Sequence, residues 1–275
     1  MPPAARTLTF AAALLLWSSA GVASATNDHF AFAWPDSGQV EVEVQRISVR
    51  RRVAMRWTLQ WRRCSDEICF EWTKPRLIAL HAAGRELDLD DDFAASVAAI
   101  ESVLPAWSVD RDGHFLGVGV GALEESLAAA HESLAAAGNF AEPLQSTLES
   151  PGLRLEAERR AKDLWQCSVG EWIGMPMEEA WVDDDSLSVR YSNKSLRGER
   201  IRQVTALRRV RRAELADLRS SFQVDLDSSR TRQVQREARV ERSTLRPIRA
   251  SQRISLGEAY EETLLIFRWP DLPAQ

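Results

Sequence analysis

Residues 39–61 have the sequence QVEVEVQRISVRRRVAMRWTLQW, in which apolar and polar side chains alternate along most of the stretch. Up to Val44 the apolar residues are even-numbered, and from Ile47 to Trp61 they are odd-numbered apart from Ala54. A period of two over this length predicts β structure with one apolar face and one solvated face. The change of phase predicts a bulge or a bend near residues 45–46. Arg51 interrupts the pattern because it falls on the apolar side.

The order of patterns along the chain predicts the fold class. Strand-like alternation covers residues 39–81, a mainly helical region follows over 91–166, and strands return over 182–269. Strands, then helices, then strands is the order of an α+β protein. We expect one large curved antiparallel sheet of about eight or nine strands, built from two strand blocks and packed against the central group of helices.

The central region itself divides into four segments. Apolar residues at helical spacing predict helices over 93–104, 123–137 and about 153–165. Between the first two helices, residues 107–119 predict a short hairpin that turns at Asp110-Arg111-Asp112-Gly113.

The N-terminus has the pattern of a secretory signal peptide. Arg6 precedes an apolar run over 8–17, and small residues end at Ala23-Ser24-Ala25. The apolar run is shorter than the roughly 20 residues that span a bilayer. We expect cleavage after Ala25, a periplasmic or secreted protein that spans no membrane, and a single α+β domain over 26–275. An uncleaved N-terminal anchor is the alternative.

Charge is distributed unevenly, and this distribution suggests possible partners. The formal net charge is −5, and together with export it argues against a nucleic-acid partner. Residues 197–253 nevertheless contain 16 Arg and seven acidic residues. Guanidinium groups on the solvated face, among them Arg208, Arg211 and Arg236, could hold phosphate or carboxylate groups of an anionic envelope ligand. The alternative is that they pair with acidic side chains on neighbouring strands.

Three cysteines allow one disulfide and leave one thiol. An exported chain meets an oxidising compartment, and the spacing of Cys64 and Cys69 suits two antiparallel partners across a tight hairpin. We expect a Cys64–Cys69 disulfide, with a bridge from either residue to Cys167 as the alternative. Cys167, between Trp165 and Val169, is expected to be a buried thiol.

No motif for catalysis, a metal site or a cofactor is present in the sequence. The nucleophile elbow, the P-loop, the dinucleotide-binding glycines and the zinc-protease motif are all missing. The acidic runs at 110–112 and 183–185 are interpreted as a turn and as a solvated loop between strands. We therefore expect no catalytic residue, metal or cofactor, and whether the protein is an enzyme stays open.

The tryptophans offer the remaining candidates for a binding site. Trp57, Trp61 and Trp72 could line an apolar cleft between a curved sheet and its helices, or they could fill the core. The first hypothesis is a non-enzymatic binding or carrier protein for an apolar or anionic amphipathic ligand, such as a lipid-like molecule of the envelope. The alternative is a module that docks an envelope protein through a sheet edge or the arginine face. A hydrolase is the third hypothesis.

Overall fold

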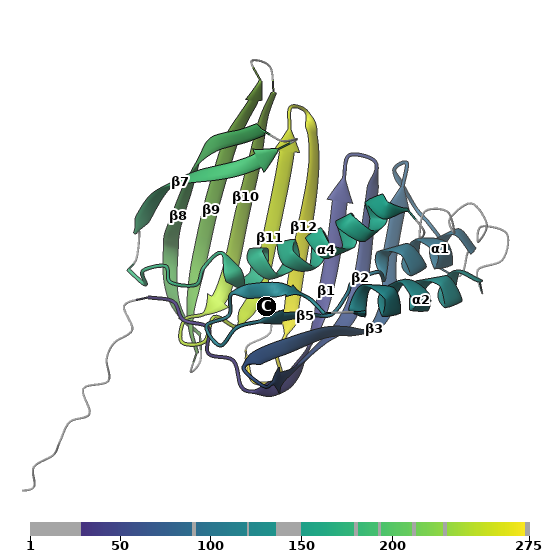
Figure 1. Cartoon of the computed structure of the whole chain (residues 1–275), viewed down its shortest axis with the longest axis horizontal. Coiled ribbons are helices and arrows are strands. Elements are labelled where there is room, and N and C mark those ends of the chain that lie inside the picture. Colours follow the sequence, from purple (N-terminus) through teal and green to yellow (C-terminus); the bar gives the residue numbers. More distant parts are fainter. Residues whose placement is uncertain are drawn as a thin grey trace, which may run out of the picture.

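The computed structural model describes residues 29–89, 92–119, 121–135, 150–178, 181–191, 194–210, 213–227 and 230–272. The predicted signal segment 1–25 lies outside the described residues, and so does Arg211. The described residues form one large antiparallel sheet and three α-helices (Figure 1). The expected α+β class is confirmed in outline, although the sheet has more strands than the sequence indicated and makes up most of the described structure.

The sheet in the described part of the chain has twelve strands. Its order is β6 (Phe115–Val118), β5 (Trp107–Val109), β3 (Glu67–Ala82), β2 (Arg51–Cys64), β1 (Ser37–Ser48), β12 (Ala259–Arg268), β11 (Pro247–Leu256), β10 (Arg230–Glu241), β9 (Ala213–Asp227), β8 (Lys194–Val210) and β7 (Val182–Tyr191), with β4 (Arg85–Glu86) paired to β3. The two strand blocks meet where β1 pairs with β12, so that Val44 lies opposite Leu265. The sheet is wider than expected because the short β5–β6 hairpin continues it beyond β3.

The change of phase in the opening stretch comes from a hairpin, and the predicted bulge near 45–46 is wrong. Strand β1 keeps one register with β2 up to Ile47, and the chain turns at residues 49–50. Val42 lies opposite Trp57 and Val44 opposite Met55. In this register an even-numbered residue always faces an odd-numbered one, so the two phases form a single continuous face.

Strand β3 includes both Phe70 and Leu80, and its register with β2 shifts twice. One expectation about the second strand block needs correction. The acidic run 183–185 lies within strand β7 and is not a loop. Its place in a strand follows from the partners on β8, because Arg202 pairs with Asp183 and Arg200 pairs with Asp185.

The helices cover one face of the sheet. Helices α1 (Asp92–Glu101) and α2 (Ala122–Ala135) lie near β3, and α4 (Pro151–Trp165) crosses in front of the central strands (Figure 1). Helix α4 begins where the Ser150 hydroxyl accepts a hydrogen bond from the backbone N–H of Gly152, and it continues into the π-helical turn η2 (Gln166–Gly170). No helix among the described residues is both long and apolar enough to cross a membrane.

An aromatic cluster fixes the helical layer to the sheet. Trp34 lies 5.0 Å from Trp61 and 5.9 Å from Trp165, measured between ring centroids. Phe70 lies 5.2 Å from Trp107. The indole N–H of Trp165 donates a hydrogen bond to the carbonyl of Gly113 at 2.9 Å, which ties the end of α4 to the β5–β6 hairpin. Several large buried rings therefore pack together where the helical layer meets the sheet.

The disulfide prediction is confirmed. Cys64 and Cys69 are bonded across the β2–β3 hairpin with their Cα atoms 6.0 Å apart. Cys167 is a free and buried cysteine on η2, as its apolar neighbours indicated.

Candidate functional site

The candidate site is a cleft between α4 and the face of the sheet that α4 covers. It is partly open to solvent and leaves about 60 Å³ for the centres of water-sized molecules. Strands β1, β2, β11 and β12 form one wall, whereas α4, η2 and the segment after α1 form the other. The apolar part of the lining is formed mainly by Val53, Met55, Trp57, Leu164 and Ile254.

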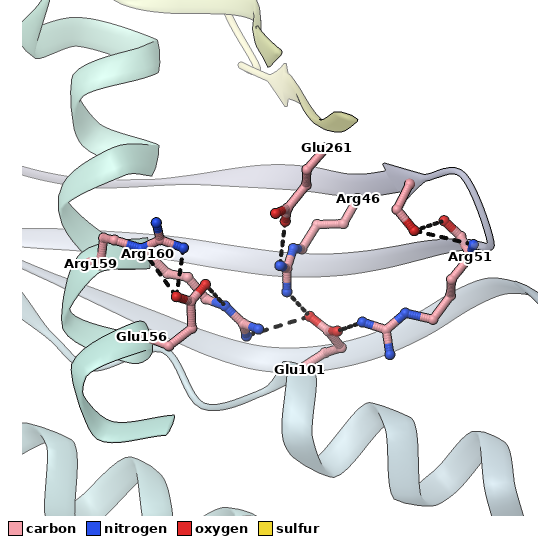
Figure 2. Close-up of polar contacts among 8 residues, drawn as sticks. Arg46, Arg51, Glu101, Glu156, Arg159, Arg160 and Glu261 are labelled. Carbon is pink, nitrogen blue, oxygen red and sulfur yellow. Dashed lines mark hydrogen bonds and ion pairs between the residues drawn. The ribbon is translucent and has the colours of Figure 1, made fainter. Parts of the chain in front are cut away.

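A buried carboxylate, Glu101, organises the polar side of this cleft. The side chain of Glu101 is only 4% exposed, and it accepts hydrogen bonds of 2.8 Å from both Arg46 and Arg51 (Figure 2). Arg46 also donates to Glu261 at 2.5 Å. Burial by itself raises the pKa of Glu101, but Arg46, Arg160 and Arg51 outweigh this effect and hold that pKa below its usual range. Glu101 is therefore ionised at neutral pH and ties α1 to the first hairpin.

Helix α4 contributes the next polar groups. Arg159 donates to Glu156 at 2.6 Å, whereas Arg160 contacts the same carboxyl group only at 3.4 Å (Figure 2). The Nη1 atom of Arg160 lies 3.6 Å from Glu101. Burial and the nearby charge of Arg46 lower the pKa of Arg160. Arg160 is thus a largely buried cation with loose ionic contacts.

Two more titratable groups of α4 and η2 line the cleft beyond these arginines. Burial raises the pKa of Asp163, against the opposing charges of Arg236, Arg159 and Arg232. Burial also raises the pKa of the Cys167 thiol to about 12. Because the thiolate is the nucleophilic form of cysteine, Cys167 is unreactive near neutral pH.

A second buried carboxylate anchors the same helical segment to the far half of the sheet. Glu171 accepts hydrogen bonds of 2.7 Å from Ser220 and from Arg236, and Arg236 also donates to Gln252 at 2.7 Å. Arg200 lies 4.0 Å from Glu171. Glu101 and Glu171 therefore hold the helical layer against the sheet at two places.

A larger hollow on the opposite face of the sheet has a different character. It leaves about 430 Å³ for the centres of water-sized molecules and is lined by Arg219, Glu237, Asp217 and Arg239 among others. Alternate residues of a strand point to opposite faces, so Glu237 lies on the other side of the sheet from Arg236. Arg219 pairs with Glu237 at 2.6 Å and Arg239 with Asp217 at 2.6 Å. Charged side chains that line this hollow are thus already paired with one another.

The structure does not bring the sequence-derived candidates together in one site. Trp57, 3% exposed, lies in the wall of the cleft. Trp61 packs against Trp34 and Phe70 in the aromatic cluster, and Trp72 packs against Trp57 outside the lining of the cleft.

The candidate arginines are also dispersed. Arg236 lies on the helix-covered face beside Glu171. Arg208 pairs at 2.9 Å with Asp217, which lines the hollow on the opposite face. Arg211 lies outside the described residues. Pairing with an acidic side chain on a neighbouring strand, the alternative raised from the sequence, describes Arg208, whereas the acidic partner of Arg236 lies outside the sheet.

The buried Glu101 and its partner Arg51 carried weak sequence signals. Arg51 breaks the alternation of its strand, and it is a partner of Glu101. Glu101 follows Ile100 in the apolar repeat of its helix, which is an unusual place for a carboxylate. Nothing in the sequence linked these two residues, because their pairing joins a hairpin to a helix about 50 positions away.

One cluster could hold a metal ion. Ligand atoms of Asp110, Asp112 and His114 lie within 4.8 Å of one another in the β5–β6 turn. One carboxylate oxygen of Asp110 already accepts hydrogen bonds from the backbone N–H groups of Asp112 and His114. These bonds are those of an ordinary turn, and the cluster lies outside the lining of the cleft.

Comparisons with known proteins give little further information. No family model and no curated protein matches the chain. A solved structure titled "Lipid-protein interactions in lipovitellin" has a TM-score of 0.42 and 7% identity, over 88% of this chain and 26% of that chain. A protein from Bacteroides fragilis, described as exported and with a YmcC-like fold, has a TM-score of 0.27 and 9% identity, over 88% of this chain and all of that one. This chain thus spans about a quarter of the lipovitellin chain, and at TM-scores below 0.5 neither similarity bears on function.

Proposed function

We propose that the protein is an exported, non-enzymatic binding or carrier protein that holds an apolar or anionic amphipathic molecule in the cleft between α4 and the sheet. One observation carries the proposal: apolar side chains, including Met55, Trp57 and Ile254, line a cleft with a polar side formed by arginines and carboxylates. Binding sites for small molecules have this composition, a mostly apolar lining with a few fixed polar groups.

Two features support export. Residues 1–25 have the layout of a signal peptide, and the Cys64–Cys69 disulfide is of the kind that persists in oxidising compartments. The periplasm or the extracellular medium is therefore the proposed location, with signal cleavage after Ala25.

The chemistry of the cleft favours binding over catalysis. Covalent catalysis needs a nucleophile within hydrogen-bond reach of a base. Cys167 has a pKa of about 12, and Glu101 is committed to Arg46 and Arg51. Neither of these two lining residues therefore supplies an activated nucleophile.

Native mass spectrometry of protein purified without detergent tests the proposal. We expect an extra mass that is lost on extraction with organic solvent. Ile254→Trp fills the cleft and should abolish that mass, whereas Ser255→Trp, next to it but on the opposite face of β11, should retain it. A bare protein that also binds none of a panel of added amphiphiles would contradict the proposal.

A second candidate function is docking of an envelope protein by strand addition at β7. This ten-residue strand ends the sheet and pairs within the described part only with β8, and Val182 on it is exposed. Unpaired N–H and C=O groups along such an edge can pair with a partner strand. A photocrosslinker at Asp184 should then capture one partner in intact cells, whereas a crosslinker at Leu155 on α4 should not.

A further inference from the structure

The polar side of the cleft contains a buried cation with unused donor groups. The Arg160 side chain is 15% exposed. Its Nε donates one long hydrogen bond of 3.4 Å to Glu156, and its Nη1 lies 3.6 Å from Glu101. Within the described part of the chain, its Nη2 group makes no hydrogen bond. A guanidinium group offers five N–H donors in a planar fork that matches carboxylate and phosphate groups, so Arg160 has room for another anionic partner.

The charges around Arg160 are not balanced. The cluster in Figure 2 contains four guanidinium groups, of Arg46, Arg51, Arg159 and Arg160, and three carboxylates, of Glu101, Glu156 and Glu261. Counted without Asp163, the cluster therefore has one positive charge in excess. Asp163 on the same helix also lines the cleft, where the charges of Arg236, Arg159 and Arg232 act on it and burial raises its pKa.

An apolar surface adjoins this cationic group inside the same cleft. Val53, Met55 and Trp57 from β2 and Ile254 from β11 line the cleft together with Arg160. A molecule with a charged group at Arg160 would place a hydrocarbon chain over Ile254 and over the small exposed parts of Val53, Met55 and Trp57, which are 2%, 4% and 3% exposed. Burial of the CH₂ groups of such a chain would add to the affinity.

On these grounds we propose that Arg160, with Arg159 beside it, binds the carboxylate or phosphate headgroup of a single-chain amphiphile whose tail lies against Met55 and Trp57. This inference rests on the proposed binding function and specifies the class of ligand. It assigns the headgroup to α4 and the tail to the sheet.

Calorimetric titration with four twelve-carbon amphiphiles tests the headgroup assignment. Dodecanoate and dodecyl phosphate carry the proposed anionic groups, dodecyldimethylamine oxide is net neutral at pH 8, and dodecyltrimethylammonium is cationic. Inorganic phosphate is a fifth probe without a tail. We expect dodecanoate and dodecyl phosphate to bind at least about 10-fold more tightly than the neutral amphiphile, and inorganic phosphate alone to bind much more weakly.

A matched pair of variants on α4 locates the headgroup. Arg160→Gln should weaken dodecanoate binding about 10-fold or more and leave the affinity for the neutral amphiphile unchanged. Arg154→Gln removes another arginine of the same helix, paired with Glu124 outside the cleft, and should change neither affinity. A merely structural role of Arg160 would weaken both amphiphiles alike, which would overturn the assignment.

The remaining outcomes separate the two proposals. Equal affinity for the anionic and the neutral amphiphile, or tighter binding of the cationic one, would overturn the headgroup inference and leave the cleft as a binding site. Inorganic phosphate binding as tightly as dodecyl phosphate would overturn the role of the tail. Failure of every amphiphile to bind would contradict both this inference and the proposed function.

Discussion

The two halves of the sheet are stabilised in different ways. In the half formed by β1, β2 and β3, tryptophans such as Trp57 and Trp61 are buried against other rings. In the half formed by β8, β9 and β10, exposed arginines such as Arg219 pair with carboxylates on neighbouring strands. Exposed ion pairs contribute little to stability, so we expect the aromatic half to carry most of the folding free energy. The cleft lies where β1, β2, β11 and β12 join these halves.

The largest effect is expected in the aromatic cluster. Trp165→Ala removes a ring that contacts Trp34 and Phe70 and that donates a hydrogen bond to Gly113. It should lower the free energy of unfolding by about 4 kcal/mol, measured by urea denaturation. A loss below about 1 kcal/mol, the level of an exposed ion pair, would contradict the assignment of stability to this half.

The next largest effect is expected at Glu101. Glu101→Gln leaves three arginines around an uncharged group and should cost about 3 kcal/mol of stability. Glu124→Gln, in the exposed pair with Arg154, is the matched control and should cost less than about 1 kcal/mol. Equal effects of the two variants would show that burial of the Glu101 cluster is energetically unimportant.

The same variant should reveal a dependence on pH. The pKa of Glu101 is lowered from 4.5 in the folded protein, so its stabilising contribution is complete above pH 4.5 and is lost as the pH falls through the lowered folded value. The difference in unfolding free energy between the wild type and Glu101→Gln should therefore shrink below pH 4.5. A difference that stays constant down to pH 2 would argue against an ionised Glu101.

A smaller effect is expected at the β2–β3 hairpin. Replacing both Cys64 and Cys69 by Ser removes a cross-link that closes only a short loop, so the loss should be about 2 kcal/mol. Thermal unfolding of the oxidised wild type, the reduced wild type and the double variant measures it. Reduction of the wild type should reproduce the effect of the substitutions.

The smallest effect is expected in the arginine-rich half. A double-mutant cycle on Arg219 and Glu237, which are 2.6 Å apart and mostly exposed, should give a coupling energy below about 1 kcal/mol. The coupling should fall further at high salt because solvent-exposed charges are screened. A coupling as large as the loss in Glu101→Gln would remove the contrast between buried and exposed pairs.

Local patterns in the sequence predicted much of the fold. Alternation identified the strands around Val44 and Met55, helical spacing identified the three helices, and cysteine spacing identified the disulfide. These features depend on neighbours within a few residues. The pairing of β1 with β12 depends on residues at opposite ends of the chain, and no local pattern specifies it.

The cleft was only partly predictable for the same reason. A space between sheet and helices was expected, and Trp57 does line it. Which rings face the cleft and which fill the core depends on how α4 crosses the sheet, so Trp61 and Trp72 could not be assigned from alternation alone. The role proposed for Arg160 could be inferred only from the distances of its guanidinium group to Glu156 and Glu101.

Fluorescence quenching by a bromine-tagged dodecanoate tests most directly the claim that a ligand occupies the cleft between α4 and the sheet. Quenching by bromine needs close contact with an indole ring, and Trp57 lines the cleft. The tagged ligand should quench part of the tryptophan emission of the wild type, and Trp57→Phe should lose that quenched component. Trp181→Phe, which removes a ring outside the cleft lining, should retain it. Undiminished quenching in Trp57→Phe, or no quenching in the wild type at saturating ligand, would contradict the account.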